Sequence, residues 1–284
     1  MSRLLFAAIA SVIITSAATL ADSLEQAAAR EWQNRVYTLR VWVGGDDIET
    51  DEHGRVLHSS GLVSWTQARF EVQKVSIHRD KIEFRGNRVG LLYDKDKHQF
   101  AKLRLFPLRL VMRIDTSKIQ PSDLGQITDS LFITDTSQLL AAMPEFWKSF
   151  AMGQVKPGND GSLPDQPNAV RTTPATGAPV GKTAEGEPIF GVPSPGITPP
   201  VVLKDPQPDY DEIARKMRIV GVDVLSAVIG PDGSVLDVQI ERPLGMGVDE
   251  RAIEAIRGWR FRPATRDGKP VAVQIKIEMS FHLY

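Results

Sequence analysis

The chain has 284 residues, which is enough for one or two domains with a substantial core. Its composition is that of an ordinary globular protein, and its formal net charge of -1 creates no global field that would favour nucleic acid or an anionic membrane surface. The absence of cysteine excludes disulfides, zinc–thiolate sites and cysteine nucleophiles.

The N-terminal segment has the pattern of a secretory signal peptide. Arg3 and the free amine precede an apolar run that begins at Leu4, and small or polar residues continue to Ala21. We predict a signal peptide over residues 1–21, with cleavage after Ala21 or Ala18. An uncleaved anchor is the alternative, because the run is near the shortest length that spans a bilayer. In both cases we expect the rest of the chain in the periplasm or cell envelope, anchored to the inner membrane if the segment is retained.

Residues 22–154 are predicted to form one β-rich domain. After a helical pattern over 23–33, short β patterns alternate with tight polar turns. The β patterns cover residues 36–43, 61–66, 70–77, 81–84, 89–93 and 103–114. We interpret the polar stretch 46–54 as a turn and residues 137–150 as a closing helical segment. Strands at this spacing favour an antiparallel sandwich or a partial barrel.

Residues 155–200 differ in composition from both flanking regions. Ten of the chain's 19 prolines fall here, with few large apolar side chains. Such a segment cannot bury enough surface to offset its chain entropy, so we predict a disordered Pro/Gly-rich linker. One apolar island, Pro188–Val192, could pack on a neighbouring element, although a local sticky spot within the linker is the simpler interpretation.

Residues 201–284 are predicted to form a second folded domain. Asp209 to Glu212 has the pattern of a capping box at the start of a short helix. A β run over 220–229 is apolar on both faces, so we expect both faces to be covered. The turn sequence Pro231–Gly233 then predicts a hairpin with a returning strand over 235–241.

A second helix follows and leads into the clearest strand of the sequence. Asp249 is predicted to cap this helix, and Gly258 is predicted to end it in the left-handed conformation. Trp259 and Phe261 then face the same way and anchor the helix against the sheet. From 271 to 284 apolar and polar residues alternate, which predicts a half-buried strand. Its inward residues are Val271, Val273, Ile275, Ile277, Met279 and Phe281.

Several motifs of this region occur in the order of a known domain. They are Asp209-Tyr-Asp-Glu-Ile-Ala-Arg215, the Pro231-Asp-Gly hairpin, Val248-Asp-Glu-Arg-Ala, Trp259-Arg-Phe-Arg-Pro-Ala264, Asp267-Gly-Lys-Pro-Val271 and Ile277-Glu-Met-Ser-Phe281. The region resembles the C-terminal domain of the TonB family. The resemblance implies an α+β fold in which two helices lie on one face of an antiparallel sheet.

The resemblance also implies a role without catalysis. The domain would grip the plug-proximal peptide of an outer-membrane TonB-dependent receptor and pass on force from an inner-membrane proton-channel complex. A physical argument supports the peptide binding. A terminal strand with no later partner leaves backbone donors and acceptors exposed, so a peptide can add there as one more strand. The same edge admits a homodimer.

The outward face of the last strand is the candidate partner-binding surface. Its members are Gln274, Lys276, Glu278, Ser280 and His282. An ordinary solvated strand face is the alternative interpretation of these residues. We predict no catalytic residue, no cofactor, no metal site and no nucleic-acid partner.

Two other groups of residues have the chemical types found in metal sites. His53, His58, His78 and His98 recur in the β-rich domain, but without a metal-ligand spacing. The acidic run that begins at Asp46 offers oxygen ligands, but not at the spacing of a known calcium loop. We therefore expect turn and surface histidines and a solvated charge run.

A function of a different class would reside in the β-rich domain. The apolar succession from Leu103 to Met112 suggests an exported small-ligand or lipid carrier, with the C-terminal domain only as a docking module. Because ligand pockets usually have volumes of roughly 300–1,000 Å³, the interior of this domain bears directly on that alternative.

Overall fold

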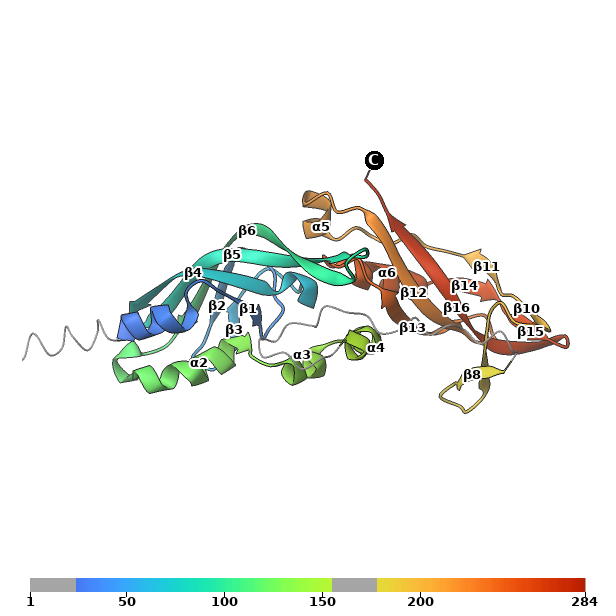
Figure 1. Cartoon of the computed structure of the whole chain (residues 1–284), viewed down its shortest axis with the longest axis horizontal. Coiled ribbons are helices and arrows are strands. Elements are labelled where there is room, and N and C mark those ends of the chain that lie inside the picture. Colours follow the sequence, from blue (N-terminus) through green and yellow to red (C-terminus); the bar gives the residue numbers. More distant parts are fainter. Residues whose placement is uncertain (1–23, 155–177, 284) are drawn as a thin grey trace, which may run out of the picture. The chain divides into compact units, whose positions relative to one another are not determined.

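The computed structural model describes residues 24–154 and 178–283, and the chain divides into two compact units (Figure 1). The first unit contains residues up to 89 together with 104–134, and the second contains 90–103 together with the chain from 135 onward. The predicted signal peptide or anchor lies outside the described residues. Within the described ranges, no helix has both the length and the apolar character required to cross a bilayer.

The first unit is built on one curled sheet, although the ends of two of its strands, within 90–103, fall in the second unit. Its strands are β1 (Arg35–Leu39), β2 (Asp47–Thr50), β3 (Val56–His58), β4 (Arg69–His78), β5 (Lys81–Asp94), β6 (Gln99–Arg113) and β7 (Phe132–Ile133). Across the sheet the order is β3-β2-β6-β5-β4-β1-β7. The pairing of β2 with β6 is parallel, with Ile48 opposite Leu110, so the sheet is mixed.

Helices pack against this sheet. A helix over 24–32 precedes β1, and η1 (Trp65–Gln67) lies between β3 and β4. After β6 come η2 (Thr116–Lys118), η3 (Pro121–Asp123) and then α2 (Leu124–Leu131). The two longer helices turn apolar sides to the strands; the helical members of this core are Leu24, Ala28, Trp32, Leu124, Ile127 and Leu131. Trp32 Nε1 donates to Thr128 Oγ1 at 2.8 Å, which joins the helices, and its ring meets Phe84 edge-on at 5.0 Å.

The architecture of this unit differs from the predicted sandwich or partial barrel. Among its described residues the core lies between one sheet and helices, not between two sheets. The predicted turn over 46–54 contains β2, because Ile48 and Thr50 are buried while the acidic residues beside them are more exposed. The stretch 61–66, predicted as a strand, contributes one bridge residue and the start of η1, where Ser64 caps the turn.

The predicted strands over 81–84 and 89–93 are one continuous strand, β5. Gly86 lies between the two predicted strands, where a close approach of the β4 backbone and not a turn requires glycine. A Cβ atom at this position would lie 1.8 Å from the carbonyl oxygen of Glu71, opposite an irregularity in β4. The glycine therefore allows two strands to continue past a bulge.

The second unit has a mixed sheet around its longest strand, β16 (Lys269–Phe281). The other strands are β8 (Pro179–Lys182), β9 (Pro188–Gly191), β10 (Ile197–Thr198), β12 (Gly221–Ile229), β13 (Val235–Arg242) and β15 (Ala264–Arg266). The main order is β10-β15-β16-β12-β13, with β9 parallel to β16 and β8 beside β9. A separate pair is formed by β11 (Val201–Lys204) and β14 (Arg260–Arg262).

Four described helices accompany this sheet: α3 (Thr136–Ala142), α4 (Glu145–Gln154), α5 (Glu212–Lys216) and α6 (Val248–Arg257). The apolar side of α6 is buried and consists of Val248, Ala252, Ile253, Ala255 and Ile256. Helix α4 lies against β13, and its Trp147 Nε1 donates to Glu250 Oε1 of α6 at 2.8 Å. The fold of this unit is thus a mixed α+β arrangement.

The helix ends of this unit are formed by other residues than those predicted. Asp211, two residues after the predicted cap, accepts hydrogen bonds from the N–H groups of Ile213 and Ala214. Asp249 lies inside the first turn of α6, which follows Gly247 at a φ of 80°. Gly258 ends α6 at a φ of -82°, in the right-handed and not the left-handed region.

The predicted disordered linker consists of two parts. Residues 155–177 lie outside the described part of the chain. From 178 to 200, where we also predicted disorder, the chain forms β8, β9 and β10. Ile189 and Phe190, from the apolar island, are buried in this sheet. The composition of this segment indicates too little apolar surface for it to fold alone. It is ordered here because β9 pairs with β16, a strand that is distant in the sequence.

Candidate functional site

The last strand, β16, has two different edges. Along one edge it pairs with β12, from Val273 opposite Ile229 to Phe281 opposite Gly221. Along the other edge β15 pairs with its beginning, and β9 pairs with residues 272–274. None of the described strands pairs with this second edge from 275 to 281, and we call this stretch the open edge.

The direction of the backbone groups on the open edge follows from one hydrogen bond. In a strand, the N–H and C=O groups of alternate residues point to opposite edges. The carbonyl of Gln274 accepts from the N–H of Val192 at 3.2 Å, so the even-numbered residues of β16 point to this side. Lys276, Glu278 and Ser280 therefore present their backbone donors and acceptors to the open edge. Such groups can bond to an added strand.

Packing beneath β16 holds the open edge in place. Its inward residues Ile277, Met279 and Phe281 are buried. The ring of Tyr210 meets that of Phe281 edge-on at 5.5 Å, and the Tyr210 hydroxyl donates to the carbonyl of Ile219. Tyr210 precedes β12 in the chain, so a residue from the start of the domain holds the C-terminal end of β16 in place.

The aromatic pair after α6 also acts as an anchor. Phe261 is buried, and Trp259 is half-buried with its Nε1 donating to the carbonyl of Pro206 at 3.1 Å. The two rings lie 6.1 Å apart. The structure thus joins the end of α6 to the first residues of the domain.

The five predicted contact residues lie on β16 or directly after it. Gln274 donates through Nε2 to Ser226 Oγ at 2.5 Å, and its backbone carbonyl is occupied by Val192. Lys276 forms an ion pair with Glu241 at 2.9 Å. Glu278, Ser280 and His282 are exposed, and His282 follows the end of the strand. Their contact with a partner stays a prediction.

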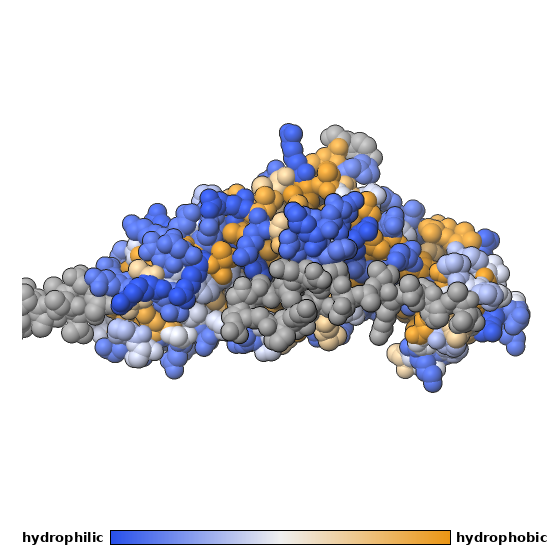
Figure 2. Space-filling model, in the orientation of Figure 1, coloured by the Kyte–Doolittle hydropathy of each residue, from blue (hydrophilic) through white to orange (hydrophobic). Residues whose placement is uncertain are grey.

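The outward face beside the open edge also contains exposed apolar side chains. Val222 of β12 lies opposite Ser280 and is 38% exposed, and Val220 just before it is 57% exposed. Figure 2 shows apolar surface near the C-terminal end of the chain. Exposure of these valines differs from the prediction, because a β run that is apolar on both faces indicates burial on both. Next to Glu278 and Ser280 they form a mixed apolar and polar strip.

A buried pair of acidic residues lies on the other face of the same sheet. Asp223 of β12 and Asp249 of α6 have no exposed surface. Asp249 accepts hydrogen bonds from the N–H groups of Leu244 at 2.7 Å and Gly245 at 2.8 Å. Burial and the neighbouring Asp249 carboxylate raise the pKa of Asp223 well above its usual value, so Asp223 holds the proton of the pair. Sequence reasoning missed this pair, although an aspartate within an apolar run is a visible signal.

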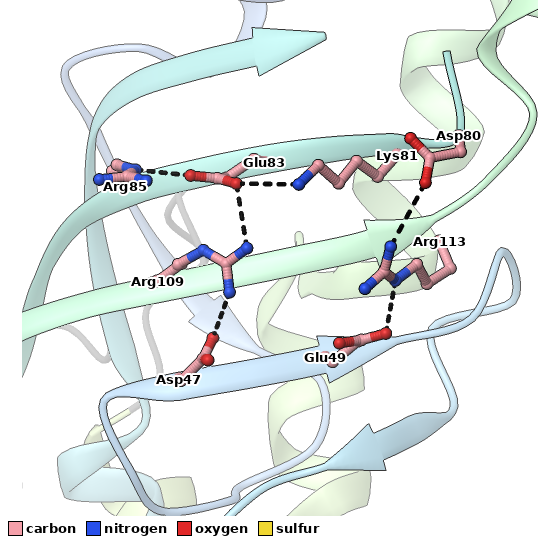
Figure 3. A network of polar contacts seen from close by, with 8 residues as sticks. All are labelled: Asp47, Glu49, Asp80, Lys81, Glu83, Arg85, Arg109 and Arg113. Atoms are coloured by element: carbon pink, nitrogen blue, oxygen red, sulfur yellow. Dashed lines mark hydrogen bonds and ion pairs between the residues drawn. The ribbon is translucent and has the colours of Figure 1, made fainter. Parts of the chain in front are cut away.

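The first unit has an ion-pair network on the outward face of its sheet (Figure 3). Glu83 of β5 accepts from Arg85 at 2.5 Å and from Arg109 of β6 at 3.1 Å, and Lys81 lies 3.5 Å away. The hydrogen bond from Arg109, together with Arg85, lowers the pKa of Glu83 to about 2. Arg109 also pairs with Asp47 of β2 at 2.9 Å. The network thus joins three neighbouring strands.

The residues weighed as metal ligands are used differently. Of the acidic run, Asp47, Glu49 and Asp51 pair with arginines. The part of the chain that the structure describes contains no group of three or more histidine, aspartate or glutamate side chains placed to hold a metal ion.

The interior of the first unit contains one small cavity between the sheet and its surroundings. It is lined by Leu39, Val41, Val43, Ile48, Thr50, Gly54, Val56, Leu110 and Leu131. Its volume of about 10 Å³ is about the least that can hold a single water molecule. A lipid or other small ligand does not fit there, so this cavity lends no support to the carrier function.

The second unit has detectable relatives. Residues 206–283 match the family described as Gram-negative bacterial TonB protein C-terminal. Protein TonB of Vibrio cholerae is 34% identical over 102 residues, which are 36% of this chain and 42% of the relative. Protein TonB of Klebsiella pneumoniae is 31% identical over 110 residues, 38% of this chain and 43% of the relative. The chain thus spans less than half the length of these curated relatives.

A solved structure, the solution NMR structure of the Pseudomonas aeruginosa TonB CTD, is also similar to this chain. It has 23% sequence identity and a TM-score of 0.26, and the alignment covers 34% of this chain and 97% of that one. Residues 206–283 belong to the TonB C-terminal domain family.

Proposed function

We propose that this chain is a periplasmic protein of the cell envelope that serves TonB-dependent transport. In this proposal its C-terminal unit binds a plug-proximal peptide of an outer-membrane receptor by strand addition along the open edge of β16. The observation that carries the proposal is the set of backbone groups on Lys276, Glu278 and Ser280 with which none of the described strands pairs. A strand added there would form main-chain hydrogen bonds, and side-chain contacts would contribute selectivity.

The outward face beside the open edge favours a peptide with polar or basic residues. An added strand turns every second side chain to the outward face, where Glu278 and Ser280 lie beside the exposed Val222. Hydroxyl or basic residues in the peptide suit Glu278, whereas Val222 is separated from the added strand by β16 itself. Contact with an inner-membrane proton-channel complex, and formation of a homodimer through the same edge, are further parts of the proposal.

Proline at position 278 tests strand addition directly. The N–H of Glu278 points to the open edge and not to β12, so Glu278→Pro should leave the β12 ladder intact while it removes one donor and places the ring in the path of a new strand. We expect the Kd of fluorescent plug-proximal receptor peptides to rise at least about tenfold, the equivalent of ~1.4 kcal/mol.

Glu278→Ala is the matched control, because it removes the same side chain but keeps the N–H. We expect its Kd to change by less than about threefold, the size expected for one exposed side chain. Circular dichroism and thermal melting of both variants would verify that the fold is kept. Equal binding by the proline variant and the parent chain would reject strand addition at this edge.

A further inference from the structure

The start of the open edge is defined by a strand that comes from outside the matched domain. The family match begins at residue 206, whereas β9 ends at Gly191. This strand pairs with β16 in parallel, with Ile189 opposite Ala272, Phe190 opposite Val273 and Gly191 opposite Gln274. It therefore occupies the stretch of β16 that would otherwise prolong the open edge toward its N-terminal side.

The ladder between β9 and β16 ends at a definite residue. Val192 donates the last hydrogen bond, to the carbonyl of Gln274. No described strand pairs with β16 beyond Gln274 on this side, because β9 itself ends at Gly191. The first backbone groups of this side that remain for another strand are those of Lys276.

Three sets of contacts hold β9 on the sheet. Ile189 and Phe190 are 8% and 5% exposed. The guanidinium of Arg266 lies over the ring of Phe190 at 4.8 Å. On its other edge β9 pairs with β8, from Phe190 opposite Pro179 to Pro188 opposite Lys182, so β9 is bonded on both sides.

We infer that β9 is a built-in stop that fixes the register and limits the length of the partner strand. The inference rests on the proposed function. Three residues, Lys276, Glu278 and Ser280, offer one donor and one acceptor each to the partner. At about 3.3 Å per residue, this stretch suits an extended segment of roughly five to seven residues. The partner peptide would therefore be selected in two ways. One is the position at which its extended segment meets Val192, and the other is the chemistry of its side chains.

Register can be measured by cysteine cross-linking, because the natural chain has no cysteine. Single variants Gln274→Cys, Lys276→Cys, Glu278→Cys and Ser280→Cys of the full chain would be mixed with plug-proximal receptor peptides that carry one cysteine at successive positions. We expect disulfides at 276, 278 and 280, each with one preferred peptide position, and at least about tenfold less at 274. Equal cross-linking at 274 would show that the partner displaces β9, and this would overturn the inference while the proposed function stands.

Removal of the stop provides the second measurement. In a variant with residues 179–192 replaced by an equal length of glycine and serine, cross-linking should extend to 274. A peptide lengthened by two residues toward that end should bind this variant about tenfold more tightly than the short peptide, because about two main-chain hydrogen bonds become available. The parent chain should bind the two peptides within about twofold of each other. A parent chain that gains equally from the longer peptide would contradict the stop.

A smaller change covers the case in which that replacement does not fold. Val192→Pro removes the donor that occupies the Gln274 carbonyl, and Val192→Ala keeps it. We expect cross-linking at 274 to increase only in the proline variant. No cross-linking at any position of the parent chain would reject the proposed function itself, which is a different outcome from cross-linking in the wrong register.

Discussion

The two sheets of this chain place carboxylates in opposite environments. Glu83 lies on the outward face of the first sheet, where Arg85, Arg109 and Lys81 surround it. Asp223 lies on the helix-covered face of the second sheet, beside a second carboxyl group, Asp249. Both side chains have little or no exposed surface, so the partners, and not burial alone, decide which protonation state the fold favours.

The two environments predict opposite dependence of stability on pH. The folded-state pKa of Glu83 is lowered from 4.5 to about 2, so its contribution is present above about 4.5 and is lost as the pH falls toward 2. The folded-state pKa of Asp223 is raised from 3.8, so its contribution is complete below that value and is lost as the pH rises through the raised pKa. Substitutions at these sites can test the comparison.

The largest effect is expected from Asp249→Ala. This change leaves the buried N–H groups of Leu244 and Gly245 without an acceptor, at a cost of about 2–4 kcal/mol in the free energy of unfolding. Urea denaturation at pH 7 measures it. Asp249→Asn keeps one acceptor and should lose less. If the alanine variant is as stable as the parent chain, the hydrogen bonds do not hold the loop before α6.

An intermediate effect is expected from Glu83→Gln. The neutral side chain leaves Arg109 and Arg85 without their shared carboxylate, which should lower the free energy of unfolding by about 1–2 kcal/mol at pH 7. The variant should also lose less stability than the parent chain between pH 4.5 and 2. The more exposed pair of Glu49 and Arg113 is the comparison, and Glu49→Gln should change stability by less than about 1 kcal/mol. Similar losses from both variants would argue against a special role of the network.

The smallest effect, and the one with the opposite sign, is expected from Asp223→Asn. Asparagine resembles the neutral acid, so it should stabilise the fold at pH 7 by on the order of 1 kcal/mol and give no gain below pH 4. Thermal unfolding across this pH range measures the difference. A gain that does not depend on pH would mean that Asp223 is not the titrating member of the pair.

Local patterns in the sequence predicted the second unit better than the first. The alternation from Val271 to Phe281 gave both faces of β16, since the period of two is a property of the strand itself. It also placed Lys276, Glu278 and Ser280 on the outward face. The short polar strand β2 and the continuous β5 were missed, because their pairing depends on β6 and on the bulge opposite Gly86.

The part of the candidate site that the sequence did not reveal depends on contacts over long distances in the chain. Ile189 and Ala272 are neighbours in the sheet although many residues separate them in the sequence. No local sequence pattern predicts a parallel pairing of this kind. Asp223 was overlooked for a similar reason. Its partner Asp249 comes from a different element, so the pair exists only after α6 has packed on the sheet.

The position of α4 limits how such a sheet can assemble. Helix α4 lies against β13, the strand beyond β12, while β8 and β10 are too short to template much pairing. A fibril grows only if each molecule has two unpaired sheet edges, one that pairs with the previous molecule and one that pairs with the next. If the open edge of β16 is the one long unpaired edge, two molecules that pair through it leave no comparable edge for a third. This arrangement guards the chain against polymerisation through this sheet at high local concentration.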